Sequence, residues 1–204
     1  MGSAAEQKTQ AQTAADSAAV AATHQVRDFS IARAPLGMPW SFKAVFTPIA
    51  AAVPFPQVQA AACDAAQRNW SQNPHRGTAI DCGGSLFARS AGSRIQVALT
   101  APAGQVVRGP AEVEAEAAKA TAVARVTFAR CPQVGTEVQT AVARWILDQS
   151  LRSLGGGSSC FTPADEELLD ELDEGSLGAA SLAIALPGPI LDAVRQSVRV
   201  ELVD

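Results

Sequence analysis

The stretch TEVQTAVARWILDQSLRSLG, residues 136–155, is the strongest fold signal in the sequence. Thr136 and Gln139 have the spacing of a capping box, in which each side chain satisfies a free backbone N–H at the start of a helix. Apolar residues then recur every three or four positions, which is typical of a helix with one buried face, and Gly155 is a good terminator. We therefore predict a helix of about five turns. Its expected buried residues are Val138, Val142, Trp145, Ile146, Leu147, Leu151 and Leu154.

Further helices are predicted on both sides of this one. Thr162 is a favourable N-cap because Pro163 follows at the first helical position and Asp165 stands three residues after the cap. This helix is expected to stop at Gly175. Other helices are expected to open at prolines, which fit the first turn: one from Pro56 to about Trp70, one at Pro110 and a short one after Pro189.

Segments that alternate apolar and polar residues predict strands. The alternation is clearest at residues 198–202, and similar sets occupy 29–31, 40–47, 94–99, 123–128 and 182–186, with one or two more strands expected over 78–89. Such alternation marks sheets with one wet face, which are usually antiparallel. We predict an α+β fold with roughly six to eight short strands in mainly antiparallel sheets and about four to five helices. A jelly-roll-like sandwich is one arrangement that fits.

The first 26 residues form a tract rich in Ala, Gln, Thr and Ser. Only Val20 and Val26 in this tract are bulky and apolar, so it offers no strong core-facing stripe. Left to itself it would be disordered or a loose helix. We predict a polar N-terminal arm at 1–26 and a single globular α+β domain at 27–204, and we expect that deleting the arm leaves a folded core but impairs assembly.

The four cysteines, Cys63, Cys82, Cys131 and Cys160, show neither a CxxC pair nor zinc-ligand spacing. We therefore expect no metal and no cofactor. No apolar run approaches the roughly 20 residues of a membrane span, and the N-terminus lacks the features of a signal peptide. The chain is expected in the cytoplasm, or in a virion assembled there, without membrane contact. In a reducing compartment its cysteines are expected to be buried thiols, with one or two disulfides as the alternative.

Candidate catalytic residues are few. His75 lies in the turn 73–77, and Cys82 follows it by seven residues, with Asp81 adjacent. An imidazole near a thiol would accept its proton and create a nucleophile. However, Asp81 and Cys82 would face opposite sides of a regular strand. The favoured interpretation is a turn histidine and a strand thiol, so no catalytic residue is assigned.

An acidic segment runs from residue 165 to 174 with seven carboxylates and no basic residue. Its leucines have helical spacing, and the segment lacks the alternating ligands and central glycine of a calcium loop. It predicts a helix with a solvated acidic face, and the alternative is a docking face for a basic partner. The carboxylates are Asp165, Glu166, Glu167, Asp170, Glu171, Asp173 and Glu174.

Charge is distributed unevenly along the chain. Residues 1–64 are neutral, residues 65–130 carry a net charge of +4, and residues 131–204 carry −8. Arg89, Arg94 and Arg125 in the basic part are candidates for contacts with an anion or a partner. Unlike patches on two copies can meet head to tail. Nucleic acid is a weaker candidate partner because the chain is acidic overall, at −4, and its arm is not basic.

These features favour a structural subunit that assembles with copies of itself, such as a capsid, coat or cement component of a phage or virus, or a component of another protein assembly. The expected contacts are the N-terminal arm and the complementary charged faces. One alternative is a small enzyme or anion-binding protein with a Cys/His-containing cleft. The other alternative is a regulatory partner that docks through the acidic helix.

Overall fold

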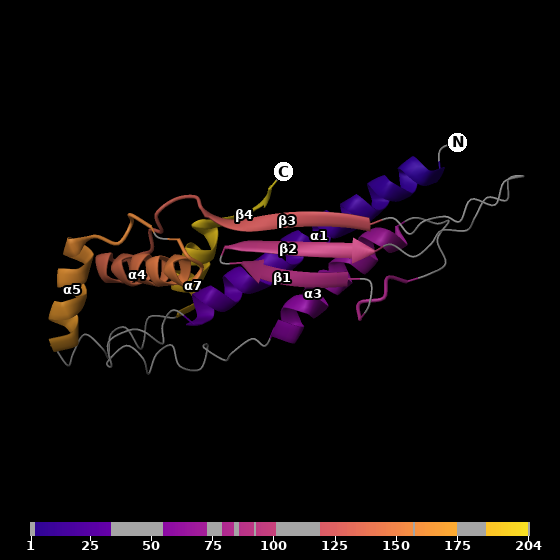
Figure 1. The fold of residues 1–204 in the computed structure, drawn as a ribbon. Helices are drawn as coiled ribbons and strands as arrows, with labels where there is room; N and C mark the ends of the chain where they lie inside the picture. Colours follow the sequence, from indigo (N-terminus) through magenta and orange to yellow (C-terminus); the bar gives the residue numbers. More distant parts are fainter. Residues whose placement is uncertain are drawn as a thin grey trace, which may run out of the picture. The chain divides into compact units, whose positions relative to one another are not determined.

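The structure, a computed structural model, describes residues 3–33, 55–72, 79–83, 86–91, 93–100, 119–156, 158–174 and 187–203 of the 204-residue chain. The helices are α1 (Ser3–Arg33), α3 (Phe55–Ser71), α4 (Glu137–Ser153), α5 (Pro163–Glu174) and α7 (Pro187–Gln196), and the strands are β1 (Leu86–Ala91), β2 (Arg94–Thr100), β3 (Lys119–Phe128) and β4 (Val198–Val203) (Figure 1). No helix within these ranges is long and apolar enough to cross a membrane.

The chain forms two compact units. The first unit comprises Met1–Gln25, Pro54–Arg125 and Val200–Asp204, and the second comprises Val26–Val53 and Val126–Arg199. The predicted boundary between an arm at 1–26 and a domain at 27–204 stays a prediction.

The sheet is built on β1, β2 and β3, which pair antiparallel (Figure 1). The register runs from Leu86 opposite Leu99 to Ala91 opposite Arg94, and from Arg94 opposite Arg125 to Thr100 opposite Lys119. Strand β4 follows β3 in the order β1-β2-β3-β4. Along β2 every second side chain is buried, so the predicted alternation at 94–99 is confirmed. The strands expected at 123–128 and 198–202 are also present, as β3 and β4.

The predicted sandwich of six to eight strands is wrong. The described residues hold one small sheet, with three strands in antiparallel register and β4 next to β3. Residues 29–31, expected as a strand, continue α1, because a helix that has formed its first turns extends at little cost through residues such as Phe29 and Ile31. The strands expected at 40–47 and 182–186 and the helix expected at Pro110 lie outside the described residues.

The N-terminal helix has a core-facing stripe that the sequence interpretation overlooked. The stripe consists of alanines spaced three and one residues apart, which is the spacing of one helix face. All of them are fully buried: Ala11, Ala14, Ala15, Ala18, Ala19 and Ala22. Gln12 on the same helix donates a hydrogen bond to the backbone carbonyl of Thr121 in β3, at 3.1 Å. Residues 3–25 of α1 are therefore an integral part of the first unit.

Helix α3 packs against β1 in the first unit (Figure 1). Its side chain Gln59 bonds the strand backbone twice: Nε2 donates to the Leu86 carbonyl at 2.7 Å, and Oε1 accepts from the Ala88 amide at 3.2 Å. The predicted helix from Pro56 to Trp70 is confirmed as Phe55–Ser71. Its Cys63 forms a disulfide with Cys82, with the two Cα atoms 5.7 Å apart.

The second unit is built around α4, as the capping box and the apolar stripe predict. Thr136 is the N-cap, and both hydrogen bonds of the capping box with Gln139 are present. The helix ends before Gly155, whose positive φ of 77° suits a glycine after the C-cap. Ile146 and Leu147 are fully buried, and α5 and α7 pack against α4.

All four cysteines are paired, which corrects the expectation of buried thiols. Besides Cys63–Cys82 in the first unit, Cys131 and Cys160 are joined in the second unit with their Cα atoms 5.4 Å apart. The two bonds match the alternative of one or two disulfides, and the sequence could not identify the pairs because widely spaced cysteines carry no signal of which ones meet in space.

Candidate functional site

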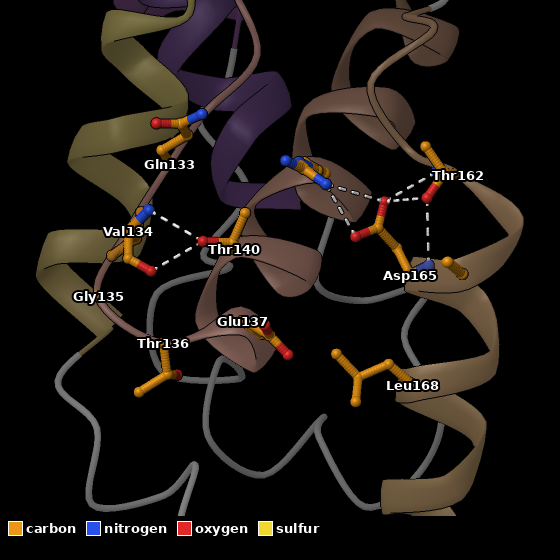
Figure 2. A pocket seen from close by; sticks show the side chains of 11 residues that line it. Gln133, Val134, Gly135, Thr136, Glu137, Thr140, Thr162, Asp165 and Leu168 are labelled. Atoms are coloured by element: carbon orange, nitrogen blue, oxygen red, sulfur yellow. Dashed lines mark hydrogen bonds and ion pairs between the residues drawn. The ribbon is translucent and has the colours of Figure 1, made fainter.

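A cleft of about 630 Å³ lies between α4 and α5 in the second unit (Figure 2). One wall is the segment Gln133–Thr136 together with Glu137, Thr140 and Arg144 of α4, and the other is Thr162 with Ala164, Asp165 and Leu168 of α5. The α4 residues follow one another at three- and four-residue spacing, so they share one helix face. Each wall thus consists of the first turns of one helix and the residues that lead into that helix.

The segment before α4 is fixed by hydrogen bonds to the helix. The Thr140 hydroxyl donates to the carbonyl of Val134 at 2.9 Å and accepts from its amide at 3.1 Å (Figure 2). Gly135 has a φ of 38°, and a Cβ atom there would collide with the side-chain oxygen of Gln139. A glycine is needed at this position because Gln139 folds back to complete the capping box.

The two walls are joined by an ion pair. Arg144 Nη1 donates to the two carboxylate oxygens of Asp165, at 3.1 and 3.4 Å. The same carboxylate accepts from the Thr162 hydroxyl at 2.7 Å and from the Thr162 amide at 2.9 Å (Figure 2). The Asp165 side chain is only 10% exposed, so this pair is shielded from water far more than a surface salt bridge.

The pKa of Asp165 reflects competing effects. Burial raises the pKa of this carboxyl, but the hydrogen bonds from Thr162 and the nearby Arg144 guanidinium together lower it below its ordinary value of 3.8. Asp165 is therefore ionised at neutral pH, and its oxygens already accept hydrogen bonds. It acts as a lock between α4 and α5 rather than as a general acid or base.

Replacing Asp165 with asparagine is expected to lower the free energy of unfolding by about 1–3 kcal/mol at neutral pH. Because the folded pKa is depressed, the stabilisation is present above the unfolded pKa and is lost as the pH falls below 3.8. Urea unfolding should therefore separate the wild type from Asp165→Asn at neutral pH and bring them together in acid. The matched control is Asp170→Asn, an exposed carboxylate on the same helix. An equal decrease in the free energy of unfolding in the two variants would show that Asp165 does not hold α4 and α5 together.

Glu137 is the second carboxylate that lines the cleft, besides Asp165. Its side chain forms no hydrogen bond or ion pair with another side chain among the described residues. It is exposed, and its carboxylate points towards the space before Leu168 of α5 (Figure 2). Arg144 Nε is buried and has no hydrogen-bond partner among the described residues. Within the described ranges, no group of three or more His, Cys, Asp and Glu side chains is placed to hold a metal ion.

The sequence-derived catalytic candidates lie elsewhere. Cys82 is bonded to Cys63, so in this form it has no thiol to act as a nucleophile. Asp81 is exposed, and its carboxylate accepts from the Gly83 amide at 2.9 Å, which is a local turn contact. His75 lies outside the described residues, so the pairing of His75 with Cys82 stays untested.

The candidate interaction residues fall into two sets. Arg94 and Arg125 stand directly opposite each other on β2 and β3, both exposed, and Arg89 on β1 has its register position opposite Gln96. On α5, Asp165 is buried in the cleft, which sets it apart from the exposed acidic residues of the helix: Glu166, Glu167, Asp170 and Glu171. Asp173 and Glu174 lie in the last turn of α5.

Sequence reasoning identified Asp165 as a helix-start residue but missed Arg144, which lies 21 residues away in the chain. The available signal was the three-residue spacing of Thr162 and Asp165, which marks a capping pair and not a solvated acidic face. Nothing local pointed to Arg144 as the partner. Comparisons of the chain with protein-family models, with curated proteins and with solved structures find no match.

Proposed function

We propose that this chain is a structural subunit that assembles with copies of itself, of the kind found in the coat or cement layer of a virus or phage or in another protein array. The observation that carries the proposal is the pair Arg94 and Arg125, two like charges placed opposite each other on the exposed face of the sheet. Such a cross-strand pair is destabilising unless opposite charge compensates it.

Compensation within the described part of the chain is incomplete. Glu201 on β4 lies 3.4 Å from Arg125, and both side chains are more than 40% exposed. No carboxylate among the described residues pairs with Arg94. An acidic surface on another copy would supply the missing charge.

Helix α5 has an excess of uncompensated negative charge, which is opposite in sign to that of the arginine pair. Its exposed carboxylates repeat four residues apart, with Glu166 preceding Asp170 and Glu167 preceding Glu171. Like charges at this spacing repel, and the last turn has no basic residue to balance the helix dipole. A basic surface from another copy would relieve this repulsion, so a head-to-tail contact between the arginine pair and α5 satisfies both surfaces.

In this proposal, residues 1–26 can join two copies in one way only. The alanine face of α1 is buried inside the first unit, so it is not a free surface. The arm would join copies only by exchanging α1 between two first units, where a neighbour's helix provides the same alanines. The charged faces are therefore the primary contact proposed.

Reversing Arg94 to glutamate is expected to weaken assembly at low salt by about tenfold for each intermolecular ion pair that it breaks, because exposed ion pairs are worth up to about 1 kcal/mol and the reversal adds repulsion. Size-exclusion chromatography with light scattering and negative-stain imaging would measure the particles. Combining Arg94→Glu with Glu167→Arg should restore them. Arg68→Glu, an equal change at an exposed site on α3, is the control.

A wild-type chain that stays monomeric at high concentration and low salt would overturn this proposal. The second candidate, docking of α5 to a basic protein partner, is favoured by the same four exposed carboxylates. It predicts a monomer whose binding to a basic protein weakens with salt and with Glu167→Arg but is indifferent to Arg94→Glu.

A further inference from the structure

The Cys131–Cys160 disulfide lies at the start of both walls of the cleft. Gln133, the first residue of one wall, follows Cys131 by two positions, and Thr162 of the other wall follows Cys160 by two positions. The bond brings the Cα atoms of the two cysteines to 5.4 Å. It therefore ties together the two segments that lead into α4 and α5.

Few other bonds tie the walls to each other among the described residues. The ion pair of Arg144 with Asp165 joins the helices, whereas the bonds of Thr140 to Val134 and of Thr162 to Asp165 each stay within one wall. Breaking the disulfide would leave the segments before the two helices without a direct covalent link, while the buried faces of α4 and α5 remain packed.

We propose that the Cys131–Cys160 disulfide is a clamp that holds the two walls of the cleft together in an oxidising compartment, where the bond persists, and that releases them when a reductant opens it. All four cysteines are paired, with one bond in each unit. Cytosolic reductants keep thiols reduced, whereas secreted and surface proteins and virion surfaces retain disulfides. This replaces the expectation of a cytoplasmic chain and remains compatible with a virion component.

The chemistry of the clamp is ordinary thiol–disulfide exchange. To close it, the thiols of Cys131 and Cys160 give two electrons and two protons to the disulfide of an oxidant, which leaves as a dithiol. To open it, a thiolate of a dithiol reductant attacks Cys131 Sγ and expels the Cys160 thiolate. The second thiol of the reductant then attacks the mixed disulfide, releases Cys131 and becomes oxidised. Cys131 is the exposed member of the pair and Cys160 is 3% exposed, so Cys131 is the point of entry.

The test compares backbone hydrogen exchange in the full chain with that in Cys131→Ser/Cys160→Ser. The matched control is Cys63→Ser/Cys82→Ser, which removes the disulfide of the first unit. In the clamp variant, amides of residues 133–136, 162 and 164–168 should exchange on the order of tenfold faster by local opening, while the amides of the α4 core around Ile146, which report the overall stability of the second unit, remain the slowest of that unit. In the control variant the cleft amides should exchange as in the wild type.

Two further measurements keep the proposal falsifiable if the serine variant does not fold. The wild-type chain can be reduced stepwise with a dithiol, with alkylation to identify the bond that opens and hydrogen exchange measured on the same sample. Cleft amides that stay protected after Cys131–Cys160 opens, or cleft amides and α4 core amides that exchange at the same rate, would overturn a local clamp. Non-reducing peptide mapping of the chain from its natural host, with free thiols blocked at lysis, should recover both disulfide-linked peptides. Free thiols there would overturn the assignment to an oxidising compartment.

Discussion

Replacing Ala15 with glutamate should destabilise the first unit by about 3–5 kcal/mol, because the substitution buries a charge that has no partner. Ala15 is fully buried in the middle of the alanine stripe of α1. Thr13→Glu places the same charge two residues away, at an exposed position of the same helix. The control should change the free energy of unfolding by no more than about 0.5 kcal/mol, which is typical of a surface substitution.

Urea unfolding followed by circular dichroism would measure both variants. Hydrogen exchange at Val97, which is fully buried in β2, would show that the loss falls on the first unit. If Ala15→Glu proves as stable as Thr13→Glu, α1 is a loose arm, as its composition suggested. The buried stripe also changes the expectation for deletion of residues 1–26, which should expose the apolar surface of the first unit rather than leave an intact core.

Helix α4 was predictable because its signals are local. The capping box of Thr136 and Gln139 and the terminating Gly155 are read over a few residues, and the spacing of Val142, Ile146 and Leu147 records which face is buried. The alternation in β2 is a similar local signal. Both elements occur where the sequence predicts them.

The prediction for helix α1 was wrong because only large apolar side chains were taken as a sign of a buried face. Ala11, Ala15 and Ala18 bury little area each, so a search for large apolar residues misses them, although all three are fully buried. The regular spacing of the alanines indicated a buried helix face, but alanines are too small to be recognised as core residues by size. The short alternation at Phe29 and Ile31 then suggested a strand where the helix simply continues.

The cleft and the disulfides depend on contacts between distant residues. Arg144 meets Asp165 across 21 positions, and Cys131 meets Cys160 across 29. Four cysteines allow three pairings, and nothing in their spacing selects one. The capping role of Asp165 was visible in the sequence, but its partner on α4 and the clamp beside it required the fold.

Removing both disulfides should have the largest effect of any change considered. The bonds close loops with sequence separations of 19 and 29, and loss of a cross-link over such loops costs about 3–4 kcal/mol each in the chain-entropy model. The bonds lie in different units, so each unit should lose its own share of about 3–4 kcal/mol. That is a large part of the stability of a typical domain, about 5–15 kcal/mol. The variant with serine at Cys63, Cys82, Cys131 and Cys160 should therefore be largely unfolded at physiological temperature.

Urea unfolding of four proteins would measure this effect: the oxidised wild type, each two-serine variant and the four-serine variant. Reductant should bring the wild type down to the four-serine variant and leave that variant unchanged, which separates loss of the bonds from loss of the cysteine side chains. A four-serine variant as stable as the oxidised chain would mean that packing holds both units without cross-links. In that case the argument for an oxidising compartment would lose its thermodynamic basis, because a chain that does not need its disulfides could fold equally well where thiols stay reduced.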